Sequence, residues 1–257
     1  MLRLYYYAAG SRGAGDPVLF LHGFGTSAHL WRYVIPRVPA GHRAIAVDLP
    51  GHGRSEAPAG TSYGPAAQAA CVTALLDELQ VPHATVVAHG MGCEIATELA
   101  TGGSRVRNLL LISPAGTGQR TPATPSRRSA AGLALRLPWN DIAVATLKQY
   151  LAAGYATRAT AVRSLDRHLQ WFRSRARRAT LAAQLRELPA SAIPIVLDQQ
   201  FEIVTGGADP FVSARRVGTR FLAPGRGTLT TLGHERHFLP EEAPETVSRL
   251  LARVLRG

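Results

Sequence analysis

Histidines, carboxylates and glycines gather in four short segments whose residue types suit acid–base chemistry. In chain order these are His22-Gly23-Phe24-Gly25, then Asp48-Leu49-Pro50-Gly51-His52-Gly53-Arg54-Ser55, then Ala88-His89-Gly90-Met91-Gly92, and finally the pair Gly206-Gly207-Ala208-Asp209 and His237-Phe238-Leu239-Pro240-Glu241-Glu242-Ala243-Pro244. Histidine and carboxylate side chains are common proton carriers in enzymes. Any one segment would be a weak signal, but all four in this order and at this spacing are specific.

The elements that must position these segments alternate between strands and helices. We predict strands at Leu2–Tyr7, Val18–Leu21, Ala44–Val47, Ala84–Ala88 and Asn108–Ile112, and helices at Ala28–Val38, Pro65–Leu79 and Met91–Ala100. Most of these strands are continuous apolar runs, which are typical of strands buried on both faces of a parallel sheet. The alternating order therefore predicts an open α/β sheet with right-handed crossovers.

A helical segment interrupts this pattern after Pro114. The later predicted elements are helices at Asp141–Leu151 and Thr160–Leu188, strands at Phe201–Thr205 and Thr228–Leu232, and a closing helix at Glu245–Leu255. Almost nothing strand-like occurs between about Gly116 and Ala190. We therefore divide the chain into an α/β core, residues 1–115 and 191–257, and an inserted helical cap, residues 116–190.

Composition excludes several classes of protein. The chain has 257 residues, of which 46% are hydrophobic, so it can form a full core and is not disordered as a whole. Its two cysteines, Cys71 and Cys93, have no metal-ligand spacing, and we expect no metal. No apolar run approaches the roughly 18 residues that span a bilayer, and the first residues do not resemble a signal peptide. These features predict a cytoplasmic protein that does not act at a membrane.

The four segments resemble those of the α/β-hydrolase superfamily, in particular its cap-bearing branch of epoxide hydrolases, dehalogenases and esterases. The resemblance covers nearly the whole chain, and it implies a mostly parallel central sheet flanked by helices with an inserted helical cap. In that family a G-x-S-x-G turn between a strand and a helix carries the nucleophile. Aligning this motif with residues 88–92 puts Ala88 on the first glycine and Gly90 on the serine. The accompanying Ala88 favours natural divergence over an introduced substitution at position 90.

The same resemblance implies roles for four further residues. The family order of nucleophile, acid and histidine makes Asp209 the acid and His237 the base. Family members carry an acidic residue and a proline five and seven residues beyond the base, and from His237 these are Glu242 and Pro244. His234 is the alternative base. The backbone N–H groups of Phe24 and Met91 are expected to form an oxyanion hole.

The vacant nucleophile position changes the predicted chemistry. Gly90 has no side chain, so covalent serine catalysis is excluded, whereas a general base and an oxyanion hole remain. These groups suit proton abstraction next to a carbonyl. We predict a cofactor-independent lyase or cyclase that acts by elimination, isomerisation or ring closure on a carbonyl-bearing, polyketide-like small molecule in natural product biosynthesis. The alternatives are a hydrolase in which His237 activates water without a covalent intermediate, and a catalytically inactive ligand-binding protein.

Positive charge is concentrated in the cap. The chain has a net charge of +12, and residues 119–190 hold thirteen of its 29 basic residues but only three of its 17 acidic residues. Arg173, Arg175, Arg177 and Arg178 are candidate contacts for substrate charge. A basic cap predicts an anionic substrate, or one tethered to an acidic acyl carrier protein. Nucleic acid is not predicted, because no recognition motif accompanies the arginines.

The other polar residues near these motifs have structural interpretations. We expect His22 and His52 to hold loops near the turn at Gly90, and His89 to pack or form a hydrogen bond. Cys93 is expected to be a small buried thiol. Ser27 is expected to cap the predicted helix Ala28–Val38.

Overall fold

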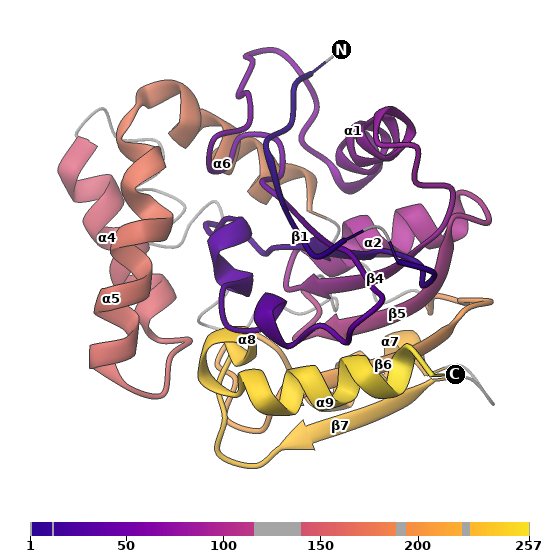
Figure 1. Cartoon of the computed structure of the whole chain (residues 1–257). Helices are drawn as coiled ribbons and strands as arrows, with labels where there is room; N and C mark the ends of the chain where they lie inside the picture. Colours follow the sequence, from indigo (N-terminus) through magenta and orange to yellow (C-terminus); the bar gives the residue numbers. More distant parts are fainter. Residues whose placement is uncertain (1, 12, 116–139, 189–193, 223–226, 257) are drawn as a thin grey trace.

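A seven-stranded sheet forms the centre of the protein (Figure 1). The computed structural model describes residues 2–11, 13–115, 140–188, 194–222 and 227–256. The strands are β1 (Tyr6–Ala9), β2 (Val18–Leu21), β3 (Ala44–Val47), β4 (Ala84–His89), β5 (Val106–Ile112), β6 (Gln200–Gly206) and β7 (Thr228–Leu232), in the spatial order β1-β3-β2-β4-β5-β6-β7. Only the β1–β3 pairing is antiparallel, so the predicted mostly parallel sheet is confirmed.

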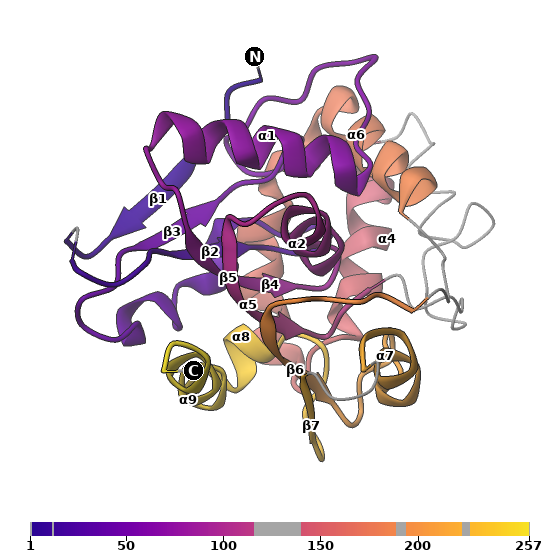
Figure 2. The same ribbon diagram turned by 90° about the vertical axis from the view of Figure 1, so that its right-hand side faces the viewer.

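Helices cover both faces of the sheet (Figure 2). They are η1 (Ala28–Trp31), η2 (Ile35–Arg37), α1 (Pro65–Glu78), α2 (Gly92–Thr101), α7 (Ala214–Phe221), α8 (Leu239–Glu242) and α9 (Pro244–Val254). One hydrophobic core includes side chains of α1, α2 and α7, and the other includes side chains of η1, α8 and α9. Within β2, Leu19 and Leu21 belong to the first core, whereas Val18 and Phe20 belong to the second. This division explains why the strand is apolar at every position.

The described part of the inserted segment is helical, and its helices lie to one side of the sheet in Figure 1. They are α4 (Asn140–Ala152), α5 (Arg158–Leu169), η3 (Gln170–Arg173) and α6 (Arg175–Glu187). The stretch predicted as helical at Thr160–Leu188 is thus divided into α5, η3 and α6. The helical backbone ends before Ser174, which is extended. The hydroxyl group of Ser174 accepts the N–H of Arg177 and so caps the start of α6. Residues 116–139 of the predicted cap lie outside the described residues.

Other predictions also differ from the structure. The strand predicted at Leu2–Tyr7 is β1, which instead runs from Tyr6 to Ala9. The predicted helix Ala28–Val38 is a pair of short 3₁₀ helices, because Pro36 lies inside it and the chain turns after Trp31. Helix α7 was not predicted, since its sequence, ARRVGTRF, offers few apolar residues from which to read a helical period. No helix within the described ranges is long and apolar enough to cross a membrane.

Candidate active site

Asp209 and His237 meet at the carboxyl end of the sheet. Asp209 follows β6, and its Oδ2 accepts a hydrogen bond from Nδ1 of His237 at 2.8 Å. The Asp209 side chain is fully buried, and its Oδ1 accepts the backbone N–H groups of Phe211 and Val212 at 2.8 and 3.1 Å. Burial raises the pKa of Asp209, but the adjacent His237 and these hydrogen bonds outweigh it and lower the pKa overall. The carboxylate therefore stays charged and fixes the imidazole ring through Nδ1.

The structure separates the two candidate bases. His237 is buried two residues before α8 begins, and its side chain is 10% exposed. His234 is exposed to solvent in the preceding turn. Asp209 thus orients His237 and not His234, which leaves Nε2 of His237 as the nitrogen available for proton transfer.

Gly90 faces that nitrogen from the turn between β4 and α2. It is buried, and its φ of +54° lies in the left-handed region that favours glycine. A Cβ atom placed on Gly90 would lie 3.5 Å from Nε2 of His237 and 3.6 Å from Cα of Gly23. A side chain at position 90 would therefore point at the base.

Two backbone amides flank this position. The N–H of Met91 lies at the start of α2, and the N–H of Phe24 lies in the turn that follows β2. Neither amide donates to an acceptor in the part of the chain that the structure describes. Both amides are therefore available to an oxygen anion. The position of Met91 at a helix N-terminus favours negative charge there further.

His22 and His52 hold the turn that contains Phe24. Nδ1 of His22 donates to the carbonyl oxygen of Gly23 at 2.8 Å, and its Nε2 accepts the N–H of Leu49 at 2.9 Å. Nε2 of His52 accepts the N–H of Gly25 at 3.3 Å. Burial lowers the pKa of His22 to about 4 and that of His52 well below its usual range. Both rings are therefore neutral at pH 7 and act as hydrogen-bonding supports for the turn.

Ser27 occupies the N-cap position of η1 but does not cap it with its side chain. Its hydroxyl instead lies 3.2 Å from Nδ1 of His168 in α5. The N–H of Ala28 donates to Oδ1 of Asp48 at 2.7 Å. A charged carboxylate is a stronger acceptor than a hydroxyl group, which accounts for the difference from the prediction.

A loop that joins α4 to α5 supports the base from the cap. The carbonyl oxygen of Gly154 accepts the N–H of His237 at 2.8 Å. A Cβ atom placed on Gly154 would lie 2.7 Å from the ring of Phe211, 2.8 Å from the ring of Phe238 and 3.1 Å from Cβ of His237. Glycine suits this close approach because it has no Cβ atom, and no residue next to Gly154 in the sequence marks it.

The neighbours of Gly154 strengthen the same attachment. The guanidinium group of Arg236 donates to the carbonyl oxygen of Ala153 at 2.8 Å, and the hydroxyl of Tyr155 donates to Glu241 at 2.6 Å. On the opposite side, Nε2 of His89 donates to the carbonyl oxygen of His237 at 3.0 Å. The segment that carries the base is therefore held by both the cap and the core.

The four cap arginines do not form one group. Arg178 is 2% exposed, and its guanidinium group donates to the carbonyl oxygens of Phe172 and Arg173 at 3.3 and 2.5 Å. Arg177 donates to the carbonyl oxygens of Gly53 and Ser55 at 2.8 and 3.1 Å and so joins α6 to the core. We therefore assign these two side chains to the structure of the cap. Arg173 and Arg175 are exposed to solvent.

Comparison with known proteins gives matches along most of the chain. A family model for the alpha/beta hydrolase fold matches residues 16–195. The dihydrolipoyllysine-residue acetyltransferase component of the acetoin cleaving system of Cupriavidus necator is 37% identical over 119 residues, which cover 46% of this chain and 31% of that protein. An epoxide hydrolase of Caballeronia sordidicola is 42% identical over 91 residues, which cover 35% of this chain and 28% of that protein. The match to this chain thus spans about a third of the length of these two relatives.

Longer matches have lower identity. A haloalkane dehalogenase of Agrobacterium fabrum is 28% identical over 262 residues, which cover 93% of this chain and 84% of that protein. Among solved structures, the enol-lactonase of Burkholderia xenovorans has a TM-score of 0.80 at 18% identity and covers 100% of this chain and 97% of its own. This structural likeness concerns the fold.

The close approach of Gly154 predicts that Gly154→Ala disturbs the base. The added methyl group would overlap two phenylalanine rings and the His237 side chain, so we expect a loss of about 1–3 kcal/mol in the free energy of unfolding. We also expect a shift or loss of the downfield proton resonance of Nδ1 of His237. Urea unfolding measures the change in free energy, and NMR measures the change in the resonance. Gly103→Ala is the control, because a Cβ atom there meets nothing within 4 Å. An unchanged resonance in Gly154→Ala would show that this contact does not position the ring.

The buried neutral histidines predict sensitivity to acid. Burial, followed by the nearby His237, lowers the pKa of His89 to about 3. Between about pH 6.5 and 3 the unfolded state then binds a proton at His89 that the folded state does not bind. Stability should fall with falling pH in this window, and His89→Gln should reduce the slope by about 1.4 kcal/mol per pH unit. Urea unfolding of His89→Gln and of the unmodified protein at several pH values measures the two slopes, and equal slopes would contradict the prediction.

Proposed function

Because the chain belongs to the alpha/beta hydrolase fold family, we propose that it is an enzyme of this fold that lacks the nucleophile and uses His237 as a general base. The observation that carries the proposal is the position of Gly90, whose missing side chain would point at Nε2 of His237 from 3.5 Å. Family members carry a nucleophile at the turn between this strand and helix. A glycine at this turn leaves the base, its acid partner and the free amides without a nucleophilic side chain.

The reaction class that fits these groups is proton abstraction next to a carbonyl. Nε2 of His237 accepts a proton from the α-carbon of the substrate, while the electron pair moves to the carbonyl oxygen. The N–H groups of Phe24 and Met91 stabilise that oxygen, and Asp209 stabilises the imidazolium ion. The enolate then expels a leaving group from the β-carbon or attacks a second carbonyl, and the proton on Nε2 goes to the departing or newly formed oxygen. The product forms by elimination or ring closure without net addition of water.

The expected magnitudes are adequate for an enzyme. A positioned general base contributes roughly 10²–10⁴ in rate, and each oxyanion-hole donor contributes roughly 10²–10³.

The exposed Arg173 and Arg175 support a further proposal, an anionic or carrier-tethered substrate. Polyketide-like compounds suit the reaction chemically, because a proton between two carbonyl groups is unusually acidic.

A hydrolase without a covalent step is the second candidate. The space left by Gly90 lies beside Nε2 of His237, where a water molecule could be activated for direct attack. Two of the similar proteins are named as an epoxide hydrolase and a haloalkane dehalogenase. The two candidates differ in whether solvent oxygen enters the product.

A labelled-solvent experiment separates these candidates. The protein is incubated in H₂¹⁸O with a panel of β-acetoxy and β-hydroxy thioesters, and the products are analysed by mass spectrometry. We expect unsaturated or cyclic products without ¹⁸O, and a rate that falls by about 10²–10⁴ in His237→Ala. His234→Ala should retain full activity. Incorporated ¹⁸O would support the hydrolase instead, and binding without conversion that is unaffected by His237→Ala would indicate a ligand-binding protein.

Restoring a nucleophile tests the assignment of Gly90. In Gly90→Ser the hydroxyl would lie within hydrogen-bonding reach of Nε2 of His237, so a fluorophosphonate probe should label the variant covalently. The unmodified protein and the double variant Gly90→Ser/His237→Ala should not be labelled. Gly103→Ser, which places a hydroxyl in open space, is the matched control. A folded Gly90→Ser variant that resists labelling would show that position 90 is not aligned for nucleophilic attack.

A further inference from the structure

A cleft of about 420 Å³ lies where the cap meets the core, apart from the candidate active site. Its lining comes from β1 and the residue before it, from η1 and η2, from the end of β3, and from α5 and η3 of the cap. The lining residues used below are Tyr5, Tyr7, Arg32, Arg54, Arg167 and Trp171. The cleft is not lined by His237, Asp209 or Gly90. Its volume is within the range of small-molecule binding sites.

The charge on the walls of this cleft is positive. Arg54 and Arg167 are exposed, and neither forms an ion pair with a carboxylate in the described ranges. Asp48 also lines the cleft, but it is 4% exposed and its two oxygens accept the N–H groups of Ala28 and Arg54 at 2.7 and 2.9 Å. Two guanidinium groups thus remain for an anion that enters from solvent.

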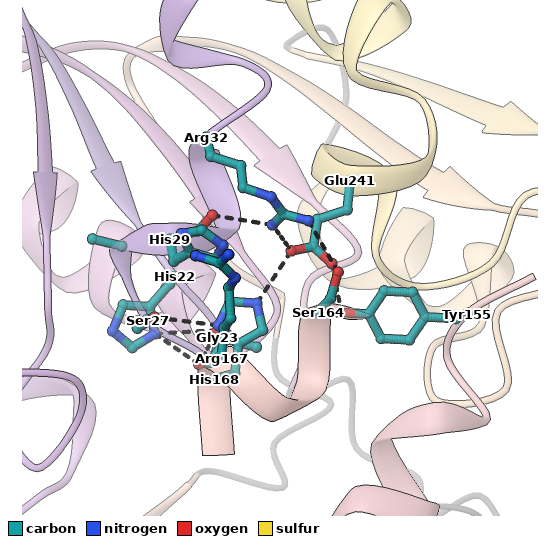
Figure 3. A network of polar contacts seen from close by, with 12 residues as sticks. His22, Gly23, Ser27, His29, Arg32, Tyr155, Ser164, Arg167, His168 and Glu241 are labelled. Carbon is teal, nitrogen blue, oxygen red and sulfur yellow. Dashed lines mark hydrogen bonds and ion pairs between the residues drawn. The ribbon is translucent and has the colours of Figure 1, made fainter. Parts of the chain in front are cut away.

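Arg32, which lines the cleft, belongs to a buried polar network that Figure 3 shows from close by. Arg32 forms an ion pair with Glu241 and donates to the hydroxyl of Ser164 at 3.0 Å. Nε2 of His168 lies 3.2 Å from Glu241. Burial raises the pKa of Glu241, but hydrogen bonds and charges from His168, Arg32 and Tyr155 lower it to about 2. The network joins the cap to the core and holds the side chain of Arg32 in one arrangement.

Aromatic side chains from the core and from the cap supply flat apolar surface in the cleft. Tyr5 and Tyr7 are 38% and 52% exposed, which is high for large hydrophobic residues. The guanidinium group of Arg54 lies over the ring of Tyr5, 4.8 Å from its centroid, and donates to its hydroxyl at 2.8 Å. Trp171 faces the cleft from the cap. Aromatic rings beside guanidinium groups bind flat anions by stacking and charge together.

We propose that this cleft is a second binding site, which takes a small organic anion with a flat aromatic body and a carboxylate or phosphate group. The acid group would bind Arg54 and Arg167, and the ring would lie against Tyr5, Tyr7 and Trp171. An occupant would contact both cap and core, and would therefore stabilise their association. Arg32 also connects the cleft to Glu241, which lies four residues after His237.

Fluorescence of Trp171 tests the site with defined probes. The chain has three tryptophans, of which Trp31 is fully buried, and the variant Trp171→Phe identifies the signal of Trp171. We expect 1-naphthoate and 1-naphthyl phosphate to change this signal until it saturates. The probe that binds more strongly shows whether the site prefers a carboxylate or a phosphate group. The neutral 1-naphthalenemethanol and inorganic phosphate should each bind at least about tenfold more weakly, since each lacks one half of the recognition.

Matched variants locate the site. Arg167→Gln and Arg54→Gln should each weaken naphthoate binding about tenfold, because each removes a charged hydrogen-bond donor. Arg163→Gln removes an equal charge from the same cap helix at a residue that does not line the cleft, and it should change binding less than twofold. Equal losses in Arg163→Gln and Arg167→Gln would overturn the proposal, as would naphthoate binding that survives both cleft variants. The assay measures binding alone, so its outcome is independent of the reaction proposed for His237.

Discussion

The orientation of one imidazole ring determines what the candidate active site can do. Asp209 holds Nδ1 of His237, and Gly154 and His89 hold its backbone N–H and carbonyl oxygen from opposite sides. A base whose ring and backbone are both fixed loses little entropy when it meets a substrate, and this is the main advantage of a preorganised site. Because Gly154 belongs to the loop between two cap helices, the cap supports the segment that carries the candidate base.

This support limits how the cap can move. The loop around Gly154 is joined to the segment from Arg236 to Glu242 by backbone and side-chain hydrogen bonds, and Arg177 joins α6 to the turn around Gly53. Opening the cap as a rigid body would break these bonds and expose the buried charge of Glu241, which is costly. Any opening that admits a substrate is therefore expected to leave α5 and this loop in place.

The sequence predicted the features that depend on local pattern and missed those that depend on long-range contact. The bounds of β2 and β3 were predicted correctly, because a strand buried on both faces is apolar at every position. The pairing of Asp209 with His237 followed from the motif order of the family that the sequence resembles. In contrast, Gly154 and Arg178 owe their roles to chain segments that only the folded state brings near them. Nothing in the adjacent residues marks one as a close approach or the other as a buried donor.

Retention of the Asp209–His237 pair is by itself weak support for catalysis. Asp209 accepts three hydrogen bonds while buried, and losing its partner would leave an uncompensated charge in the core, so stability alone would preserve the pair. Stability does not explain why Nε2 of His237 faces the point where a Cβ atom of residue 90 would lie. It also does not explain why the amides of Phe24 and Met91 have no acceptor in the described chain. Hydrogen-bond donors and a base without partners stabilise the folded state less than paired groups would. Their coincidence at the turn that holds the nucleophile in family members is the stronger argument that this site acts on a substrate.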